Sequence, residues 1–415
     1  MLSRRDFIKG GVALVSIGTT AQSLLKGAVA FAAQHEAATN LAAAGRILIL
    51  VQLAGGNDGL NTVVPAGSGA YRSARRTLAI PEEAVLPLAE GYGLHPNLAG
   101  LKRAWDEGKL AVVRGVGYPN QDYSHFKSMA IWQAGDPELK LDHGWLGRTL
   151  EKLESEQHDP FLGFNIGSST PAELETPAVS IPSVQDPADY GFKVRGRPAD
   201  ASEPRTRTLL KLYEQYPAQS PYGVLLETTV EAAVASSAAL AEAGRRYQPA
   251  VAYPETSFGA GLSLLAEAIV GGLGVRVGHI TLGGFDTHAN QAADHGELMQ
   301  VLDEGLTAFQ ADLEAHGRAD DVLVLTWSEF GRRVAENANG GTDHGASSVV
   351  FALGSRVRGG LFGDPPSLER LVDNGNLGYT TDFRQVYATV IEGWLGVPHE
   401  ELLGRRWEQL GFVAG

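Results

Sequence analysis

Carboxylates and histidines recur in four short segments of this chain, each directly after an apolar run or at the start of a helical pattern. They are Asp58; Ser124 and His125; Asp286 and His288; and Glu329, Asp343 and His344. Carboxylate oxygens and imidazole nitrogens without thiols are the ligand set of a hydrolytic Zn, Mn or Mg site. Single Asp-x-His and Asp-His pairs occur often by chance, so the prediction rests on their common position after strands.

The stretch Val322–Gly345 is the centre of this pattern. It opens with six apolar or β-prone residues, which is typical of a parallel strand buried on both faces, and then breaks into Ser328–Gly331 and Gly340–Gly345. Open α/β sheets bind ligands just past the carboxyl ends of their strands. The alternative is a strand end followed by a Gly-rich turn, in which Asp343 caps its own backbone.

The first strong strand pattern, Arg46–Leu53, runs into the Gly-rich loop Ala54–Asn61, where Asp58 is the only carboxylate. Glycines let a backbone turn sharply and approach a ligand closely. A plain Asn-Asp-Gly turn without function is the alternative. We expect Asn57 in this loop, and Arg332 after the later strand, to contact the substrate.

Ser124 and His125 lie where the segment Asn120–Phe126 runs into the helical pattern Lys127–Gln133. The amides and the positive dipole end of a helix N-terminus favour an anion. Capping by Asp122 or Ser124 is the alternative, and it accounts for Ser124 better than for His125.

Two strand patterns, Val275–Leu282 and Val322–Thr326, are joined by a helix pattern with a single apolar stripe. We expect Asp294 to cap this helix, with Glu297 at its third position. Strand, helix and strand with this spacing form a βαβ unit, whose strands are parallel. Their carboxyl ends should therefore meet at one edge of the sheet.

The continuous apolar runs predict a three-layer α/β/α fold with a mainly parallel central sheet, in a single domain over residues 46–415. Residues 155–205, rich in Pro, Ser, Gly and Asp, are expected to form an irregular insertion. The remaining predicted strands and helices are Leu110–Val113, Ser348–Leu353, Pro96–Glu107, Pro221–Arg245, Ser257–Gly272, and Thr381–Leu395 with Thr381 or Asp382 as its cap.

Residues 1–30 predict an export signal. Arg4 and Arg5 precede the weakly apolar Gly10–Leu25, which is typical of a twin-arginine signal peptide, and residues 31–45 resemble a tether. A membrane anchor is the alternative, but polar residues interrupt the run well short of ~20 apolar residues. We expect a periplasmic or secreted protein without a transmembrane segment in its mature chain.

Composition excludes several classes of function. The chain carries 34 Lys and Arg against 48 Asp and Glu, a formal charge of −14, so it lacks the basic surface of a nucleic-acid-binding protein. Its 0 Cys exclude thiolate catalysis, Fe–S clusters and Cys-ligated zinc.

The motifs LAGGNDGLN, DYSHF, GGFDTH, TWSEFGR and GTDHG, together with the export signal, resemble a Tat-exported bacterial family of unknown function, domain-of-unknown-function family 1501. That family is similar in turn to the alkaline phosphatase and sulfatase superfamily, which implies an alkaline phosphatase-like fold. The resemblance implies metal-ligand roles for Asp58, for Asp286 with His288, and for His344.

The chain departs from the superfamily pattern at two places. Glu329 replaces an Asp, and Phe330 stands where a metal-binding His would be, which implies one ion rather than two. The superfamily carries its nucleophile at a helix start. Residue type favours Ser124 there, whereas the Trp-x-x-Gly ending at Trp132–Gly135 places His125 at that position.

We therefore expect an exported hydrolase that uses Zn, Mn or Mg to cleave phosphate or sulfate esters of a small molecule or polymer. Ser124 would attack the ester. The alternative is a non-catalytic descendant of the same fold that binds a ligand or a protein partner through the same cleft.

Overall fold

The computed structural model describes residues 45–154, 159–185, 221–373 and 375–413, together with residues 208 and 211. The expected export signal lies outside these residues, as does the tether apart from Gly45. The chain divides into two compact units, and every predicted site residue belongs to the larger one, which comprises 46–145, 249–263 and 279–415. A single domain over 46–415 stays a prediction. Among the helices that the structure describes, none has both the length and the apolar character needed to cross a bilayer.

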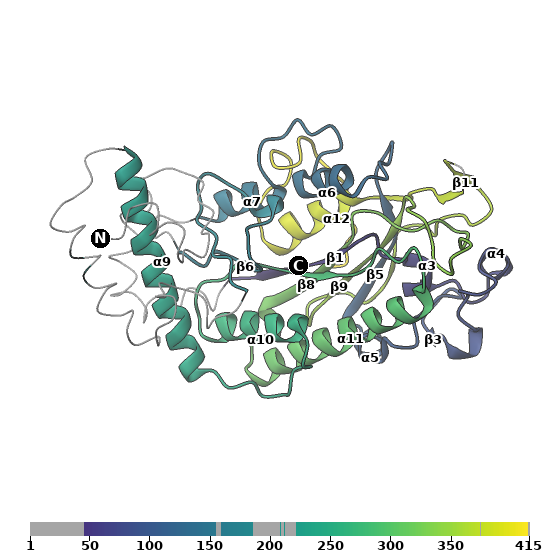
Figure 1. Ribbon diagram of the computed structural model, residues 1–415, viewed down its shortest axis with the longest axis horizontal. Helices are drawn as coiled ribbons and strands as arrows, with labels where there is room; N and C mark the ends of the chain where they lie inside the picture. Colours follow the sequence, from purple (N-terminus) through teal and green to yellow (C-terminus); the bar gives the residue numbers. More distant parts are fainter. Residues whose placement is uncertain are drawn as a thin grey trace. The chain divides into compact units, whose positions relative to one another are not determined.

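The core of the larger unit is a central sheet with the strand order β10-β5-β9-β8-β1-β7 (Figure 1). Its strands are β1 (Ile47–Ala54), β5 (Leu110–Gly117), β7 (Val277–Gly283), β8 (Val322–Trp327), β9 (Ser348–Leu353) and β10 (Gly360–Phe362), with β13 (Thr381–Asp382) beside β5. β1 and β8 pair in parallel and are almost wholly buried. The predicted α/β fold and its strands are confirmed within a few residues.

Strand β9 runs antiparallel to both of its neighbours, β5 and β8. The mainly parallel sheet that we expected therefore contains an antiparallel strand at Ser348–Leu353. The chain returns from β8 through residues 328–347 without a crossover helix, and only an antiparallel partner can be reached that way. Its continuous apolar run reflects burial in the middle of the sheet, which does not depend on strand direction.

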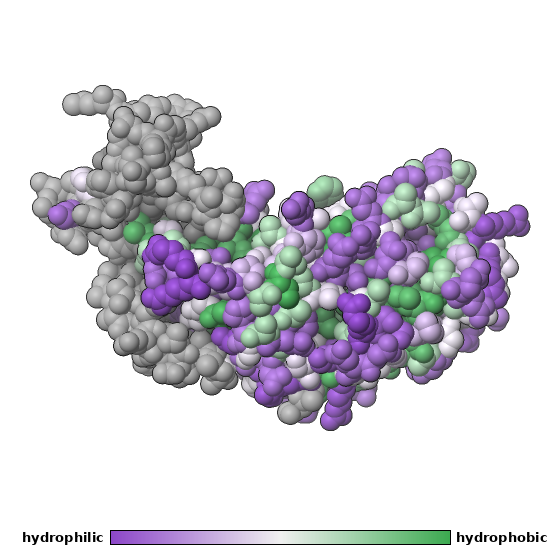
Figure 2. Space-filling model, turned by 90° about the horizontal axis from the view of Figure 1, so that it is seen from below, coloured by the Kyte–Doolittle hydropathy of each residue, from purple (hydrophilic) through white to green (hydrophobic). Residues whose placement is uncertain are grey.

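Helices cover both faces of this sheet (Figure 1). α5 (Ala99–Asp106) and α11 (Gln291–Ala315) lie on one side, and α6 (His125–Ala134) and α12 (Phe383–Ala388) on the other. α12 continues as the π-helical turn Thr389–Trp394. The view in Figure 2 is taken from the side of α5 and α11, where hydrophilic residues surround smaller hydrophobic patches.

Helix α11 begins a turn earlier than expected. Its N-cap is Asn290, which has a φ of 51° and makes no side-chain capping bond, and Asp294 lies within the first turn. The predicted Asp294 cap is wrong because tertiary bonds set the helix start: the amide of Gln291 donates to the carbonyl of Gly340 at 3.0 Å. The cap of α12 is Asp382, as one of its two alternatives predicted, in a capping box with Gln385.

The smaller elements connect the sheet to its surroundings. They are α3 (Gly59–Thr62), α4 (Gly69–Ala74), the three-stranded sheet of β2 (Val63–Val64), β4 (Gly93–Leu94) and β3 (Leu86–Pro87), and the hairpin of β11 (Leu371–Val372) and β12 (Asn376–Leu377). Further helices are α7 (Trp145–Leu153), α9 (Pro221–Arg246) and α10 (Ser257–Val270). Of the expected insertion 155–205, residues 159–185 are described and contain β6 (Gly163–Ile166) and the 3-10 turn Ala172–Leu174.

Asp58 is fully buried in an ion pair with Arg75, which follows α4. The guanidinium donates to both carboxylate oxygens at 2.5 and 2.9 Å, and Gln291 donates to Oδ2 at 2.5 Å. Burial alone would raise the pKa of Asp58, but the Arg75 charge outweighs it and holds that pKa below its ordinary value. The carboxylate also caps α3 by accepting from the amide of Leu60. This ion pair therefore ties the loop after β1 to α4.

We predict that Arg75→Met lowers the free energy of unfolding by about 3–5 kcal/mol, because it leaves a buried carboxylate without its cation. Arg72→Met, three residues earlier and within α4, is the matched control. Its partner Glu82 lies 3.7 Å away with both side chains largely exposed, so it should cost less than about 1 kcal/mol. Urea denaturation of both variants measures the difference, and equal losses would contradict a structural role for the Arg75 pair.

Candidate functional site

The loops after β1, β7 and β8 are held together by one side chain, Arg332, which is 1% exposed. Its Nη2 donates to the Asp286 carboxylate at 2.7 Å. Its remaining bonds go to the backbone carbonyls of Gly55, Gly56, Phe285 and Thr342. Because these carbonyls come from loops far apart in the sequence, Arg332 fixes the strand ends relative to one another.

Two glycines allow this close packing. Gly55 and Gly56 have φ values of +123° and +80°, which favour glycine. A Cβ on Gly56 would lie 2.3 Å from the Phe330 ring, and one on Gly55 would lie 2.4 Å from the Asp286 amide. The first loop therefore contacts the other two through its backbone, which explains the Gly-Gly pair in the sequence.

Asp286 is the centre of the histidine group. Its Oδ1 lies 3.1 Å from Nε2 of His344 and 3.1 Å from Nε2 of His288, and its Oδ2 lies 3.6 Å from Nε2 of His125. Donor atoms of His125, Asp286 and His344 all lie within 4.8 Å of one another, close enough for one metal ion. His288 extends the group, since its Nε2 is 3.0 Å from that of His344.

The tautomer of His344 follows from its surroundings. Its Nδ1 lies 2.8 Å from the backbone carbonyl of Tyr123. A carbonyl can only accept a hydrogen bond, so Nδ1 carries the proton and the neutral ring presents the lone pair of Nε2 to Asp286.

The same reasoning applies to the other two imidazoles. Nδ1 of His125 lies 2.8 Å from the buried Glu329 carboxylate, and Nδ1 of His288 lies 3.3 Å from the Asp343 carboxylate. In the tautomer that donates from Nδ1 to these carboxylates, each ring turns Nε2 toward Asp286. Three Nε2 atoms therefore converge on one carboxylate.

The electrostatics fit a cation among these atoms. Burial would raise the pKa of Asp286, but the hydrogen bond and the charge of Arg332 outweigh it and lower that pKa to about 2. Burial also lowers the pKa of His344. At neutral pH an ionised carboxylate thus faces an imidazole lone pair, an arrangement that a metal ion stabilises. Nitrogen and oxygen donors with oxygen partners behind each His are typical of Zn sites.

Ser124 occupies the N-cap position of α6, next to His125. Its side chain is exposed, and its hydroxyl makes no hydrogen bond to any residue that the structure describes. The ring of Phe330 lies 4.8 Å from that of His125 and 4.6 Å from that of His344, between centroids. A hydrophobic ring thus packs against this side of the donor group.

The structure keeps several other predicted residues out of the donor group. Asp58 is engaged by Arg75 and Gln291, and Arg332 is buried with every nitrogen bonded. Asn57 is fully buried, and its Oδ1 lies 3.1 Å from Nε2 of His295. Glu329 and Asp343, predicted as ligands, lie behind two of the histidines and orient them.

An open cleft of about 770 Å³ leads to the donor group. His288, Asp343 and His344 line it together with Arg333 and with residues that the sequence reasoning gave no role, namely Tyr123, Asp373 and Asn376. Tyr123 donates from its hydroxyl to Asp373 at 3.0 Å and accepts from Asn376 at 3.0 Å. Burial raises the pKa of Tyr123 to about 12, so its hydroxyl stays protonated. The sequence gives no signal for Tyr123, because it contacts His344 through its backbone carbonyl and not through its side chain.

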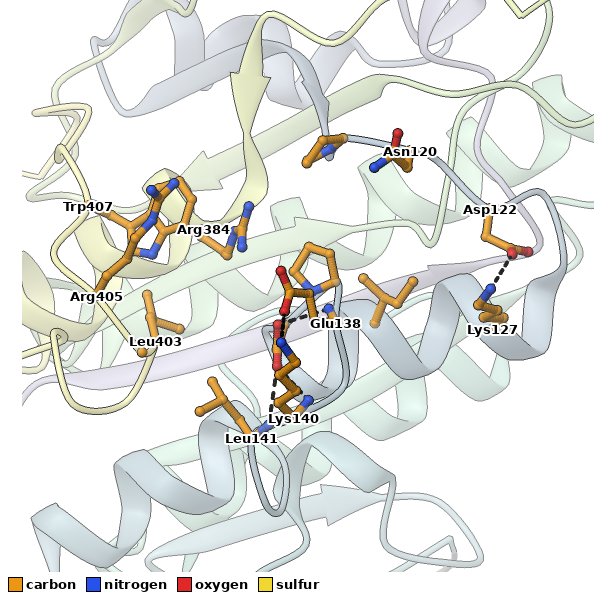
Figure 3. Close-up of a pocket in the computed structure, with 15 residues that line it drawn as sticks. Asn120, Asp122, Lys127, Glu138, Lys140, Leu141, Arg384, Leu403, Arg405 and Trp407 are labelled. Carbon is orange, nitrogen blue, oxygen red and sulfur yellow. Dashed lines mark hydrogen bonds and ion pairs between the residues drawn. The ribbon is translucent and has the colours of Figure 1, made fainter.

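A second groove, of about 630 Å³, lies between α6 and the residues around α12 (Figure 3). Lys127 there pairs with Asp122 at 3.1 Å, and Lys140 pairs with Glu138. The guanidiniums of Arg384 and Arg405 lie over the Trp407 ring. No histidine within the described ranges lines this groove, whereas His288 and His344 of the donor group line the first cleft.

A family model described as "Protein of unknown function (DUF1501)" matches residues 111–406. No curated protein matches the chain. Solved structures to which it is similar include Ps i-CgsB (11% identity, 89% of this chain and 75% of that chain, TM-score 0.42). Others are the PsFucS1 sulfatase from Pseudoalteromonas sp. (12%, 94% and 74%, 0.37) and the lipoteichoic acid synthase LtaP from Listeria monocytogenes (12%, 90% and 76%, 0.36).

We predict that Nε2 of His344 is unprotonated between about pH 7 and 8, because Nδ1 donates to a carbonyl and burial lowers the pKa of the ring. Long-range ¹H–¹⁵N spectra of the imidazoles should show this tautomer, and added Zn²⁺ should shift the Nε2 resonances of His125, His288 and His344. His295, buried beside Asn57, is the control and should not respond. A protonated Nε2 on His344 at that pH would contradict the geometry.

Proposed function

The chain belongs to the DUF1501 family of proteins of unknown function, and from that premise we propose that it is an exported, metal-dependent hydrolase of phosphate or sulfate esters. One observation carries the proposal: the Nε2 atoms of three histidines converge on the Asp286 carboxylate. A divalent cation among them would engage all four donors.

The residues that would hold the ion are Asp286, His125, His288 and His344. A bound divalent cation supplies Lewis-acid stabilisation of the charge that develops on a phosphoryl or sulfuryl oxygen. The packing of Phe330 against two of these rings supports one ion rather than two, since a phenyl ring offers no ligand.

The surrounding residues orient this set. Glu329 and Asp343 fix two of the rings through Nδ1, and the Tyr123 carbonyl fixes the third. Oxygen acceptors behind metal-binding histidines set the tautomer and make the ring a better ligand. Arg332 holds Asp286 in place through Oδ1.

Ser124 is the nucleophile in this proposal. Its exposed hydroxyl stands at the N-terminus of α6, where helix amides favour the anionic ester oxygens. The oxygen would attack phosphorus or sulfur as the bond to the leaving alcohol breaks, and the hydroxyl proton would pass through solvent to that alcohol. Water would later cleave the resulting Ser124 ester and release phosphate or sulfate. His125, the other choice for the nucleophile, has its two nitrogens directed at Glu329 and Asp286, which suits a ligand.

The proposed substrate is a phosphate or sulfate ester of a small molecule or a polymer. Export through the twin-arginine route, directed by Arg4 and Arg5, is part of the proposal and rests on the sequence. The open form of the cleft is compatible with either substrate size.

A non-catalytic binding protein is the second candidate. It is favoured by the contact of Arg332 with Asp286 at 2.7 Å, because a guanidinium already offsets part of the carboxylate charge without a metal. The two candidates differ in what a purified protein does with an ester, not in the position of the cleft.

We predict that the purified protein holds about one Zn, Mn or Mg ion and hydrolyses p-nitrophenyl phosphate or p-nitrophenyl sulfate. His344→Ala should lose the ion and at least about 100-fold in activity, because it removes one of few ligands. Ser124→Ala should keep the ion and lose the activity. Elemental analysis and initial rates measure both.

His316→Ala is the control for removal of an imidazole, since His316 pairs with Asp312 at the end of α11, outside the donor group. It should keep metal and activity. A protein that holds no metal in either the unchanged or the His344→Ala form would contradict the proposal. Metal binding without turnover of either ester would instead support the binding protein.

A further inference from the structure

We infer that Arg333 is the residue that binds the anionic group of the ligand in the histidine cleft. The sequence-based expectation gave this role to Arg332, which is buried and fully bonded. The inference rests on the proposed function for the identity of the anion, a phosphate or sulfate group. It adds a specificity-determining residue that the metal-binding set does not contain.

The backbone of Arg333 is fixed on both sides. Its amide donates to the carbonyl of Asp343 at 3.0 Å, and its own carbonyl accepts from Arg75 at 3.0 Å. The preceding residue, Arg332, pairs with His344 in an isolated β-bridge. Neighbouring side chains of an extended segment point to opposite sides. Arg332 thus enters the interior while Arg333 lines the cleft.

The guanidinium of Arg333 is available to a ligand. Its side chain makes no hydrogen bond or ion pair with any residue in the described part of the chain, although it is half-buried. Of the carboxylates that share the cleft, Asp343 accepts from Asn337 and His288 and also feels the charge of Arg333, and Asp373 accepts from Tyr123.

The chemistry of the cleft favours an anion at this place. A guanidinium presents paired N–H donors that match two oxygens of a phosphate or sulfate group. His288 and His344 of the donor group line the same cleft as Arg333. A tetrahedral anion offers enough oxygens to face both the guanidinium and an ion held by the donor group.

The other groove provides a matched comparison (Figure 3). Arg405 there is exposed and lies 3.8 Å from the centroid of the Trp407 ring. Replacing it removes the same charge from the same unit of the protein without touching the histidine cleft. An effect of net charge alone would therefore appear in both variants.

The test is binding of inorganic phosphate to protein that carries its bound metal, measured by isothermal titration calorimetry at fixed ionic strength. Arg333→Gln should weaken phosphate binding by about 10- to 100-fold, the range for loss of charge-assisted hydrogen bonds. Arg333→Lys should restore part of the affinity, and Arg405→Gln should leave it unchanged. Equal thermal stability of the variants checks that each is folded.

Unchanged phosphate binding by Arg333→Gln, an equal loss in Arg405→Gln, or the absence of phosphate binding by the unchanged protein would each overturn the inference. The proposed function fails separately. A protein that binds phosphate through Arg333 but hydrolyses no ester refutes the hydrolase and keeps this inference. An active hydrolase whose phosphate affinity does not change when Arg333 is replaced refutes this inference and keeps the proposed function.

Discussion

The buried guanidinium of Arg332 is the constraint on which this site depends. It satisfies carbonyls from the loops after β1 and β7 and from the segment before His344, and it anchors the carboxylate of Asp286. Buried carbonyls without a donor cost free energy, so these loops are stable in this arrangement only while the guanidinium is present. A lysine has a single nitrogen and could not replace its planar set of donors.

Once Asp286 is fixed, the three histidines are determined by oxygen atoms behind them. Glu329 comes from the loop after β8, the Tyr123 carbonyl from the segment before α6, and Asp343 from the loop before β9. Each acceptor orients a ring, so the donor group is prepared by the fold before any ion binds. The ionised carboxylate of Asp286 then faces the Nε2 atoms of three histidines, and this set of donors is the reason that we propose a cation there.

The sheet and the convergence of the acids and histidines could be predicted from the sequence, because buried strands are continuous apolar runs and their ends meet at one edge. The roles of individual residues could not. Asp58 follows a strand as Asp286 does, but Arg75 neutralises it, and no local pattern reveals a side-chain pair formed across two separate segments. Arg332 and Arg333 are adjacent residues of the same type. They differ only because the extended backbone directs the Arg332 side chain into the interior and the Arg333 side chain into the cleft.

The most direct test of the central claim is a crystal structure of the protein grown with one equivalent of Zn²⁺, with anomalous differences recorded at the zinc edge. We expect one strong peak bounded by Nε2 of His125, His288 and His344 and by the Asp286 carboxylate. A structure in which those nitrogens stay within hydrogen-bonding distance of Asp286, with zinc bound elsewhere or not at all, would contradict it.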